Sequence, residues 1–316
     1  MASYPESAPL ASCFDLDRLN ADLDVLRHQH WGAQRAYGQD GFWREADIDW
    51  RILPLRSVGG DPVRTDCGGA GLEDFADTEW LAKTPYFSEI IAGIPAPVRS
   101  VRLMALGVDT TVREHCDGKY GFACGTLRLH VPVQTNLGCV VVIDGRTRHW
   151  EAGRLWFGDV GRRHYVANTG DSVRVHLVID CLVSRELIGL FPPGFQDLLP
   201  LSCVMFARDR VPLGHAELGQ FCCRFPVPAE FPQWSEEEVV AGPDADGAIE
   251  VSDGRLLLSI DGKPAFGLVH LGLGEFRLTG WTEERTILVG PDSTVRFRVR
   301  NGRQFHELSR AARQAC

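Results

Sequence analysis

Two histidines and an aspartate are spaced along this chain as the ligands of a catalytic metal are. His115 and Asp117 form a His-x-Asp pair, and His164 follows 49 residues after the first histidine (164 − 115). Residues two apart on a strand share a face, so we expect the pair to lie on a strand and to face one ion. Two imidazoles and one carboxylate leave three metal positions open, the arrangement used for non-haem Fe(II) and O2 chemistry. The pattern therefore favours an oxygenase.

Basic residues recur close to this group. Arg174 and His176 lie two apart in the segment VRVHLVID, and Arg128 and His130 lie two apart in LRLHVPV. Basic side chains inside apolar strands are costly unless they meet an anion or a partner. The planar fork of an arginine suits a carboxylate, so a dicarboxylate co-substrate is one interpretation of Arg174. Structural ion pairs inside a barrel are the other interpretation.

The sequence around these residues predicts short strands. Between residues 98 and 183, β-branched runs alternate with turn sequences such as Asp144-Gly145 and Asn168-Thr169-Gly170. Regularly spaced short strands of this kind are typical of a sandwich or jelly roll. We expect a mainly β fold, a double-stranded β-helix (jelly roll or cupin-like) open at one end.

Two helices are expected before this region. Asp15 can cap a helix whose leucines recur on one face between residues 16 and 26. A second helix is expected to begin at Pro85, with Thr84 as its cap, and to stop near Gly93. The fold is thus expected to carry N-terminal helices.

Two further segments precede the β-helix. Ile52 and Pro54 lie in a sequence that favours an edge strand, and residues 58–72 form a glycine-rich loop that could cover a pocket. We therefore expect this strand to lie at the edge of its sheet.

The chain divides into two expected parts. Residues 1–195 form the catalytic domain, with its core at 98–183, and residues 196–316 form a β-rich accessory region of unknown role. In the second part, Asp261-Gly262 predicts a hairpin and residues 295–300 alternate as a strand does. We expect this region to end in a helix.

Composition limits the classes of function. The 316 residues are 44% hydrophobic and 24% charged, ordinary values for a globular protein, and the net charge of −9 argues against nucleic-acid or anionic-membrane binding. No run approaches the roughly 18–20 apolar residues that span a bilayer. The ten cysteines are scattered without a Cys-x-x-Cys pair, which favours reduced thiols. With no secretory signal apparent, the expected location is cytoplasmic.

Four ordered blocks carry a resemblance to a known family. They read R-E-H-x-D from 113, R-L-H-x-P-V from 128, G-x-L-W-F-x-D from 153 and R-V-H-L-V-x-D from 174. Over roughly residues 14–183 the chain resembles the aspartyl/asparaginyl β-hydroxylases, which include bacterial hydroxylases of free proline and of carrier-bound aspartate. These are Fe(II)- and 2-oxoglutarate-dependent oxygenases.

The resemblance implies roles for particular residues. It implies His115, Asp117 and His164 as catalytic iron ligands and Arg174 as the anchor of the distal carboxylate of 2-oxoglutarate, with O2 as the oxidant. It further implies that three neighbouring residues help to hold the co-substrate: Arg128, His130 and His176. Because Asp117 keeps the carboxylate position that related halogenases lack, hydroxylation is favoured over halogenation.

Substrate residues are also suggested. The segment from Trp50 to Arg56 resembles a strand of the proline hydroxylases that faces the substrate. Arg56 is therefore a candidate for a substrate carboxylate, or else a solvated edge residue, and Trp50 and Asn168 are further candidates. The implied substrate is a small amino acid or an amino-acyl unit, free, peptidyl or attached to a carrier protein. An arginine stripe could dock an acidic carrier or form a solvated strand face; it comprises Arg296, Arg298 and Arg300.

Two other functions use some of the same features. A cupin-like zinc hydrolase or isomerase would use the same three ligands without 2-oxoglutarate, but it would need no dicarboxylate anchor. A non-catalytic protein could bind metal and 2-oxoglutarate as a sensor. Slow consumption of 2-oxoglutarate without substrate would distinguish the enzyme from such a binding protein.

Overall fold

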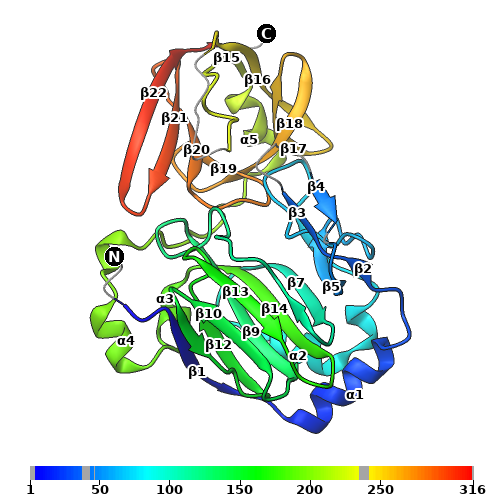
Figure 1. The fold of residues 1–316 in the computed structure, drawn as a ribbon. Helices are drawn as coiled ribbons and strands as arrows, with labels where there is room; N and C mark the ends of the chain where they lie inside the picture. The colour runs from blue at the N-terminus through cyan, green and yellow to red at the C-terminus, as the bar shows by residue number, and fades with distance from the viewer. Residues whose placement is uncertain (1–3, 38–42, 46, 235–241, 315–316) are drawn as a thin grey trace. The chain divides into compact units, whose positions relative to one another are not determined.

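The computed structural model describes residues 4–37, 43–45, 47–234 and 242–314. Its contacts divide the chain into two units (Figure 1). Unit 1 comprises Met1–Gly68 and Phe75–Phe206, and unit 2 comprises Gly69–Asp74 and Ala207–Cys316. The expected boundary at residue 195 therefore differs from this division, which also assigns part of the glycine-rich loop to unit 2.

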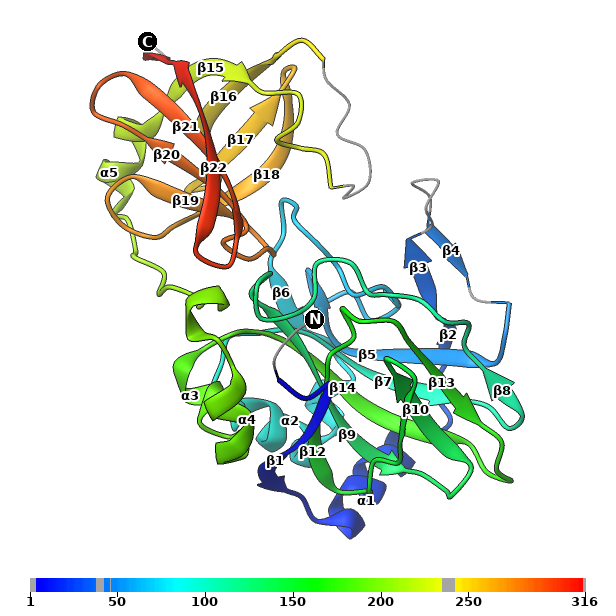
Figure 2. The same cartoon turned by 60° about the vertical axis from the view of Figure 1, so that its left-hand side comes forward.

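Unit 1 contains two sheets that together form the expected double-stranded β-helix (Figures 1 and 2). The larger sheet has the order β1 (Ser7–Cys13), β12 (Arg154–Gly158), β9 (Thr126–Gln134), β14 (Arg174–Leu182), β7 (Val98–Leu106), β5 (Trp50–Val58) and β2 (Gly32–Ala33), with β6 (Phe75–Asp77) also paired to β5. The smaller sheet has the order β11 (Arg146–Arg148), β10 (Cys139–Ile143), β13 (His164–Asn168) and β8 (Thr110–Thr111). A separate hairpin joins β3 (Arg35–Tyr37) and β4 (Trp43–Glu45).

Two helices cover one face of the larger sheet (Figure 2). Helix α1 (Leu16–Leu26) begins where expected, because the Asp15 carboxylate accepts hydrogen bonds from the first-turn amides. Helix α2 (Pro85–Ala92) follows the short turn η1 (Leu81–Lys83) and also has the expected bounds. The Thr84 hydroxyl does not cap α2, because it donates instead to backbone carbonyls of the preceding turn.

The helix-covered face uses alternate residues of each strand. In β14, Val175, Leu177 and Ile179 belong to the apolar core that also contains the helix residues Leu19 and Phe87. Side chains in a strand alternate between its two faces, so the intervening residues of β14 lie on the opposite face. That second face carries the basic residues that the sequence picked out.

One expectation for unit 1 is wrong, and one strand was not anticipated. Strand β5 is not at an edge, because it lies between β7 and β2 and also pairs with β6. The N-terminal residues Ser7–Cys13 form β1, an edge strand that the sequence did not suggest. The hairpin at Asp144-Gly145 is confirmed, and both residues have the positive φ that a type I′ turn requires.

Short helices end unit 1. They are α3 (Arg185–Ile188), α4 (Pro193–Leu198) and η2 (Leu201–Cys203). No helix of the described ranges is both long and apolar enough to cross a membrane.

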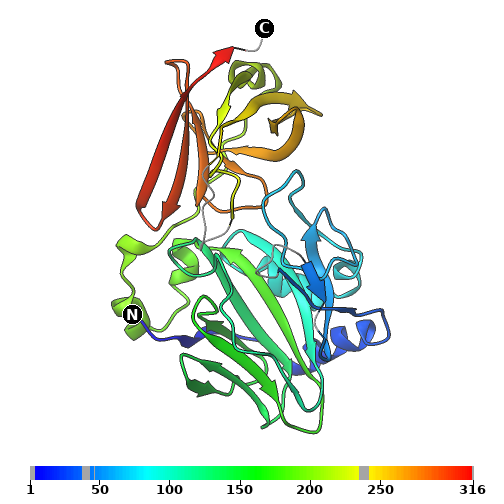
Figure 3. The same ribbon diagram turned by 45° about the horizontal axis from the view of Figure 1, so that its top comes forward.

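Unit 2 is β-rich, as expected, and forms a sheet with its own apolar core (Figure 3, yellow to red). The sheet order is β22 (Gln304–Ala311), β21 (Thr294–Asn301), β20 (Arg285–Val289), β19 (Glu275–Leu278), β18 (Lys263–His270), β17 (Arg255–Ile260), β16 (Ala245–Ser252), β15 (Cys223–Val227) and β23 (Arg313–Gln314). Two helical turns precede it, α5 (His215–Leu218) and η3 (Gly219–Phe221). The expected C-terminal helix is wrong, because residues 304–311 pair with β21 as a hairpin strand.

Candidate active site

The backbone brings the predicted metal ligands together. His164 opens β13, and His115 lies in the segment between β8 and β9. Their amides and carbonyls bond reciprocally, His115 N to His164 O at 2.9 Å and His164 N to His115 O at 2.8 Å. The expectation of a strand at His115 and Asp117 is therefore wrong, but this isolated bridge fixes the pair beside β13.

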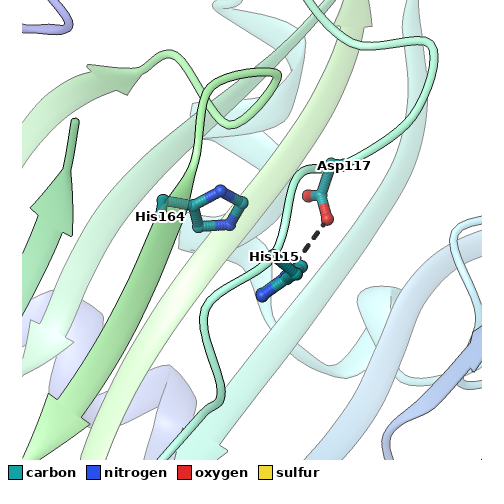
Figure 4. A group of neighbouring side chains, drawn as sticks. All are labelled: His115, Asp117 and His164. Carbon is teal, nitrogen blue, oxygen red and sulfur yellow. Dashed lines mark ion pairs between the residues drawn. The ribbon is translucent and has the colours of Figure 1, made fainter.

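The three side chains converge (Figure 4). One ligand atom from each of His115, Asp117 and His164 lies within 4.8 Å of the other two. His115 Nε2 is 3.4 Å from Asp117 Oδ1, and the two imidazole rings have centroids 4.3 Å apart. The group has the size and donor types of a three-ligand metal site.

Backbone carbonyls set the tautomer of both histidines. His115 Nδ1 lies 2.8 Å from Arg113 O, and His164 Nδ1 lies 2.9 Å from Arg162 O. A carbonyl oxygen can only accept, so each Nδ1 carries a proton and donates it. Nε2 of each ring is then left as the ligand atom, which is the usual orientation of metal-binding histidines.

The pKa shifts of Asp117 and His164 favour protonation states that suit a cation. Burial alone would raise the pKa of Asp117, but the positive charge of Arg128 and the hydrogen bond with His115 lower it to about 2. The hydrogen bond with Asp117 raises the pKa of His115, whereas burial lowers the pKa of His164. The carboxylate is therefore ionised at neutral pH, and His164 is neutral.

A second group of predicted residues lies on the face of β14 away from the helices. Arg174 is buried, with its Nε donating to His176 Nε2 at 3.0 Å and its Nη2 2.8 Å from Nδ1 of the same ring. Within the part of the chain that the structure describes, no carboxylate pairs with Arg174, and burial lowers its pKa to about 10. A buried guanidinium without a counter-ion is energetically unfavourable, so this position suits an anion.

His130 adjoins this arginine. Its ring lies 5.6 Å from that of His176 and 4.8 Å from that of Trp150. Both ring nitrogens are buried, and neither has a hydrogen-bond partner among the described residues. Burial and the charge of Arg174 lower the pKa of His130 and of His176 well below the usual value, so both rings are neutral. The structure thus brings three of the predicted co-substrate residues together.

Arg128, the fourth predicted co-substrate residue, is engaged by the protein. Its Nη1 lies 2.5 Å from Asp117 Oδ2, its Nε donates to Asp180 Oδ1 at 2.7 Å, and its Nη2 donates to the Tyr120 hydroxyl at 2.6 Å. These contacts place Arg128 against Asp117, a predicted metal ligand. A direct contact with the co-substrate stays a prediction.

The predicted substrate residues have different surroundings. Trp50 packs against an apolar patch that includes Ile52 and Met104, and its buried indole N–H has no partner within the described ranges. Arg56 donates to Asp77 Oδ1 at 2.5 Å and to the carbonyl of Phe75, so β6 already holds its guanidinium. Trp50 is therefore the better placed of the two to meet a ligand.

Asn168 requires a correction. It is fully buried, and its amide nitrogen donates to the carbonyls of Leu106, Gly107 and Ser172. Its amide oxygen accepts from Asn136 and from the Gly170 amide. With these groups already bonded, Asn168 fastens the ends of several strands, and the substrate-binding interpretation is wrong.

Two residues of the site were missed. Asp180 follows Arg174, His176 and Val178 at every second position of β14, so the alternation could have placed it on the same face. Tyr120 lies between β8 and β9, where no pattern predicts a contact, yet its hydroxyl donates to Asp180 Oδ2 at 2.9 Å.

A double-stranded β-helix with two histidines and one carboxylate is the arrangement that non-haem metal oxygenases use. A family model described as Aspartyl/Asparaginyl beta-hydroxylase matches residues 15–183, and the chain belongs to this family. As a member it is an enzyme, a dioxygenase of the hydroxylase type. The family resemblance drawn from the four sequence blocks is confirmed.

Solved structures with a similar arrangement are distant. The non-heme α-ketoglutarate dependent carbocyclase SnoK from nogalamycin biosynthesis matches at 14% identity and a TM-score of 0.37, over 57% of this chain and 80% of that chain. An oxidoreductase of the 2OG-Fe(II) oxygenase family from Burkholderia pseudomallei matches at 14% identity and a TM-score of 0.34, over 51% and 78%. A predicted oxalate decarboxylase from Thermotoga maritima matches at 16% identity and a TM-score of 0.25, over 50% and 97%. A comparison with curated proteins found no match. Similarities this low support no inference about the reaction.

Proposed function

We propose that this protein is an Fe(II)- and 2-oxoglutarate-dependent hydroxylase of a small amino acid or amino-acyl unit. In the overall reaction, O2 and 2-oxoglutarate convert a substrate C–H bond to C–OH and yield succinate and CO2. One oxygen atom enters the product and the other enters succinate. The family assignment supports the reaction type, and the residues below support the two ligands.

Arg174 is the observation that carries the proposal. It is buried on the inner face of β14 and has no carboxylate partner among the described residues. The penalty for an unpaired buried charge is several kcal/mol, which a dicarboxylate would remove by placing its distal carboxylate there. The neutral ring of His130, which has no hydrogen-bond partner among the described residues, supplies a further hydrogen-bonding group beside it. A metal enzyme without 2-oxoglutarate would have no use for this arrangement.

The metal group fits Fe(II). His115 and His164 present Nε2 because their Nδ1 atoms bond to carbonyls, and Asp117 is held ionised. Bound iron would supply the activation of O2 that no side chain can provide. The protein's own part is to orient the three ligands and to exclude water, which the buried patch of Ile52, Met104 and Val178 serves.

The amino-acid substrate is proposed on family grounds and on the position of Trp50. This residue pairs with Leu106 in the register of β5 and β7, and Leu106 pairs with Arg174 in the register of β7 and β14. The three residues therefore form one row across the sheet. The buried N–H of Trp50 has no partner in the part of the chain that the structure describes, and it is suited to an acceptor such as a substrate carboxylate. Whether the substrate is free, peptidyl or attached to a carrier protein is left to experiment.

Succinate formation tests the proposal. The wild-type protein, loaded anaerobically with Fe(II), would be supplied with O2, 2-oxoglutarate and a panel of amino acids, their amides, short peptides and carrier-loaded forms. His164→Ala, Arg174→Ala and Arg174→Lys would be compared with His28→Ala, which removes an exposed histidine of the same unit.

Each variant has a distinct expected result. His164→Ala should lose iron retention and turnover together. Arg174→Ala should raise the apparent KM for 2-oxoglutarate by roughly 30- to 1000-fold, since a charge-assisted two-point contact contributes about 2–4 kcal/mol. Arg174→Lys should recover only part of this loss, because a point charge cannot reproduce the fork. An unchanged KM in Arg174→Ala, or full activity in His164→Ala, would reject the proposed assignment.

A further inference from the structure

A buried carboxylate that the proposed reaction does not use lies next to the metal group. Asp180, on β14, is 1% exposed. Its Oδ2 accepts from Ser100 at 2.8 Å, Tyr120 at 2.9 Å and Arg102 at 3.2 Å, while its Oδ1 accepts from Arg128 Nε at 2.7 Å. A carboxylate so deeply buried and so fully bonded has a fixed orientation.

The fixed Asp180 carboxylate in turn holds the guanidinium of Arg128 in place. The guanidinium forms a two-point contact with Asp180, because Nη2 also donates to Oδ2 at 3.0 Å. Its Cζ lies 4.4 Å from the centre of the Tyr120 ring, and Nη2 donates to the hydroxyl of the same tyrosine. A two-point ion pair and an aromatic contact together determine both the position and the plane of the fork.

The third nitrogen of this fixed fork reaches the metal group. Arg128 Nη1 donates to Asp117 Oδ2 at 2.5 Å, whereas Asp117 Oδ1 lies 3.4 Å from His115 Nε2. One carboxylate oxygen is thus occupied by the arginine and the other faces the histidine. The chain from Asp180 through Arg128 to Asp117 selects which oxygen is offered to a cation.

We propose that Asp180 is a positioning residue which, through Arg128, fixes the Asp117 carboxylate so that Oδ1 alone binds the metal. The inference rests on the metal group of the proposed function and not on the substrate. Arg128 is bonded to both Asp180 and Asp117, so its positive charge is divided between two carboxylates. Asp117 therefore keeps part of its negative charge for a cation. Without Asp180, Arg128 would pair with Asp117 only or turn away from it, and both changes weaken a cation site.

Metal affinity and metal spectra test this role without turnover. Co(II) would be titrated into the full-length protein, and its visible absorption bands would report the coordination of the ion. Asp180→Asn is the main variant. Glu6→Gln is the matched control, because Glu6 is equally buried in unit 1 and also pairs with two arginines, Arg146 and Arg148.

Asp180→Asn should bind Co(II) about 10- to 100-fold more weakly, the range typical of residues that orient a metal ligand, with a changed visible spectrum. Glu6→Gln should bind as the wild type does. A double-mutant cycle adds Arg128→Met: if Asp180 acts through Arg128, Asp180→Asn should have no further effect on affinity in the Arg128→Met protein. Wild-type affinity and spectrum in Asp180→Asn, or effects that simply add in the cycle, would overturn the proposal.

A milder variant covers the case in which Asp180→Asn does not fold. Tyr120→Phe removes only the hydroxyl that bonds to both Asp180 and Arg128, and it should weaken Co(II) binding in the same direction by a smaller factor. No change in Co(II) affinity there would count against the proposal. A wild-type protein that binds Co(II) but forms no succinate would contradict only the proposed function, whereas one that binds no Co(II) would contradict both.

Discussion

Two buried charges, Glu275 of unit 2 and Arg174 of unit 1, have opposite surroundings. In unit 2, Glu275 is 6% exposed and is surrounded by cations: Arg300 at 2.7 Å, Arg208 at 2.8 Å and Arg298 at 3.4 Å. The Thr286 hydroxyl also donates to it. In unit 1, Arg174 is equally buried, yet the described residues provide it with two nitrogens of His176 and no carboxylate.

This difference separates a structural cluster from a proposed binding site. Burial alone would raise the pKa of Glu275, but its hydrogen bonds with Arg208 and Thr286 lower it to about 2, so the cluster is balanced within the protein. Burial lowers the pKa of Arg174, and no carboxylate of the described ranges opposes the effect. A charge that the fold itself does not compensate marks the place where a ligand of opposite charge would be stabilising.

The largest expected effect is in unit 2. Glu275→Gln leaves several arginines without their shared carboxylate and should lower the free energy of unfolding by about 3 kcal/mol, the lower end for a broken buried pair because Arg208 is partly exposed. Urea unfolding followed by circular dichroism measures it. Glu307→Gln is the control, since Glu307 pairs with Arg298 but is more exposed, and it should lose less than about 1 kcal/mol. Equal losses in the two variants would show that the Glu275 cluster is not a stabilising element.

In unit 1, removing a buried charge is expected to raise the free energy of unfolding instead of lowering it. Arg174→Met replaces an uncompensated charge by an apolar chain and should raise the free energy of unfolding by about 1–2 kcal/mol when 2-oxoglutarate is absent. Arg102→Met, which removes a partner of Asp180, should be destabilising instead. Thermal unfolding with and without 2-oxoglutarate measures both effects. The co-substrate should stabilise the wild type but not Arg174→Met, and destabilisation by Arg174→Met would mean that the arginine is satisfied by the fold.

The pH dependence of stability should also distinguish the clusters. The folded-state pKa of Glu275, about 2, is below its ordinary value of 4.5. The folded state therefore favours the ionised form, and this contribution is complete above pH 4.5 and is lost as the pH falls toward 2. Thermal unfolding would be measured between pH 6 and 2.5. The wild type should be more stable than Glu275→Gln at pH 6, and this difference in stability should shrink as the pH falls below 4.5. A constant difference across the range would contradict the assigned ionisation.

The clustering of His115, Asp117 and His164 was predictable from sequence because its signal is local. The His-x-Asp pair, His164 and Arg174 are recognisable from residue type and spacing. The contact of Arg128 with Asp180 was not, because Asp180 is 52 positions away and only the pairing of β9 with β14 sets the two side by side. Spacing reveals which residues can do chemistry, while strand register determines which of them are already bonded.

The errors in the fold have a similar cause. Strand β5 was expected at an edge because the short strands that flank it, β2 and β6, have no recognisable pattern. Residues 304–311 lack the alternation of β21, and their strand conformation comes from pairing with it across the Asn301-Gly302 turn. Asn168 was grouped with His164 by proximity in sequence, whereas its contacts belong to neighbouring strand ends.

The smallest expected effect concerns the arginine stripe of β21. Arg296 pairs with Asp292 at 2.6 Å, Arg298 pairs with Glu307 at 2.7 Å, and Arg300 shares Glu275. Because acidic residues of the same unit already meet these charges, Arg296→Gln should change the free energy of unfolding by about 0–1 kcal/mol and leave the KM for a carrier-loaded substrate unchanged. Arg224→Gln, which removes a more exposed arginine of unit 2, is the control. If Arg296→Gln raises the KM for the carrier-loaded form alone and Arg224→Gln does not, the stripe contacts the carrier despite its internal pairing, and complete pairing would no longer identify a purely structural cluster.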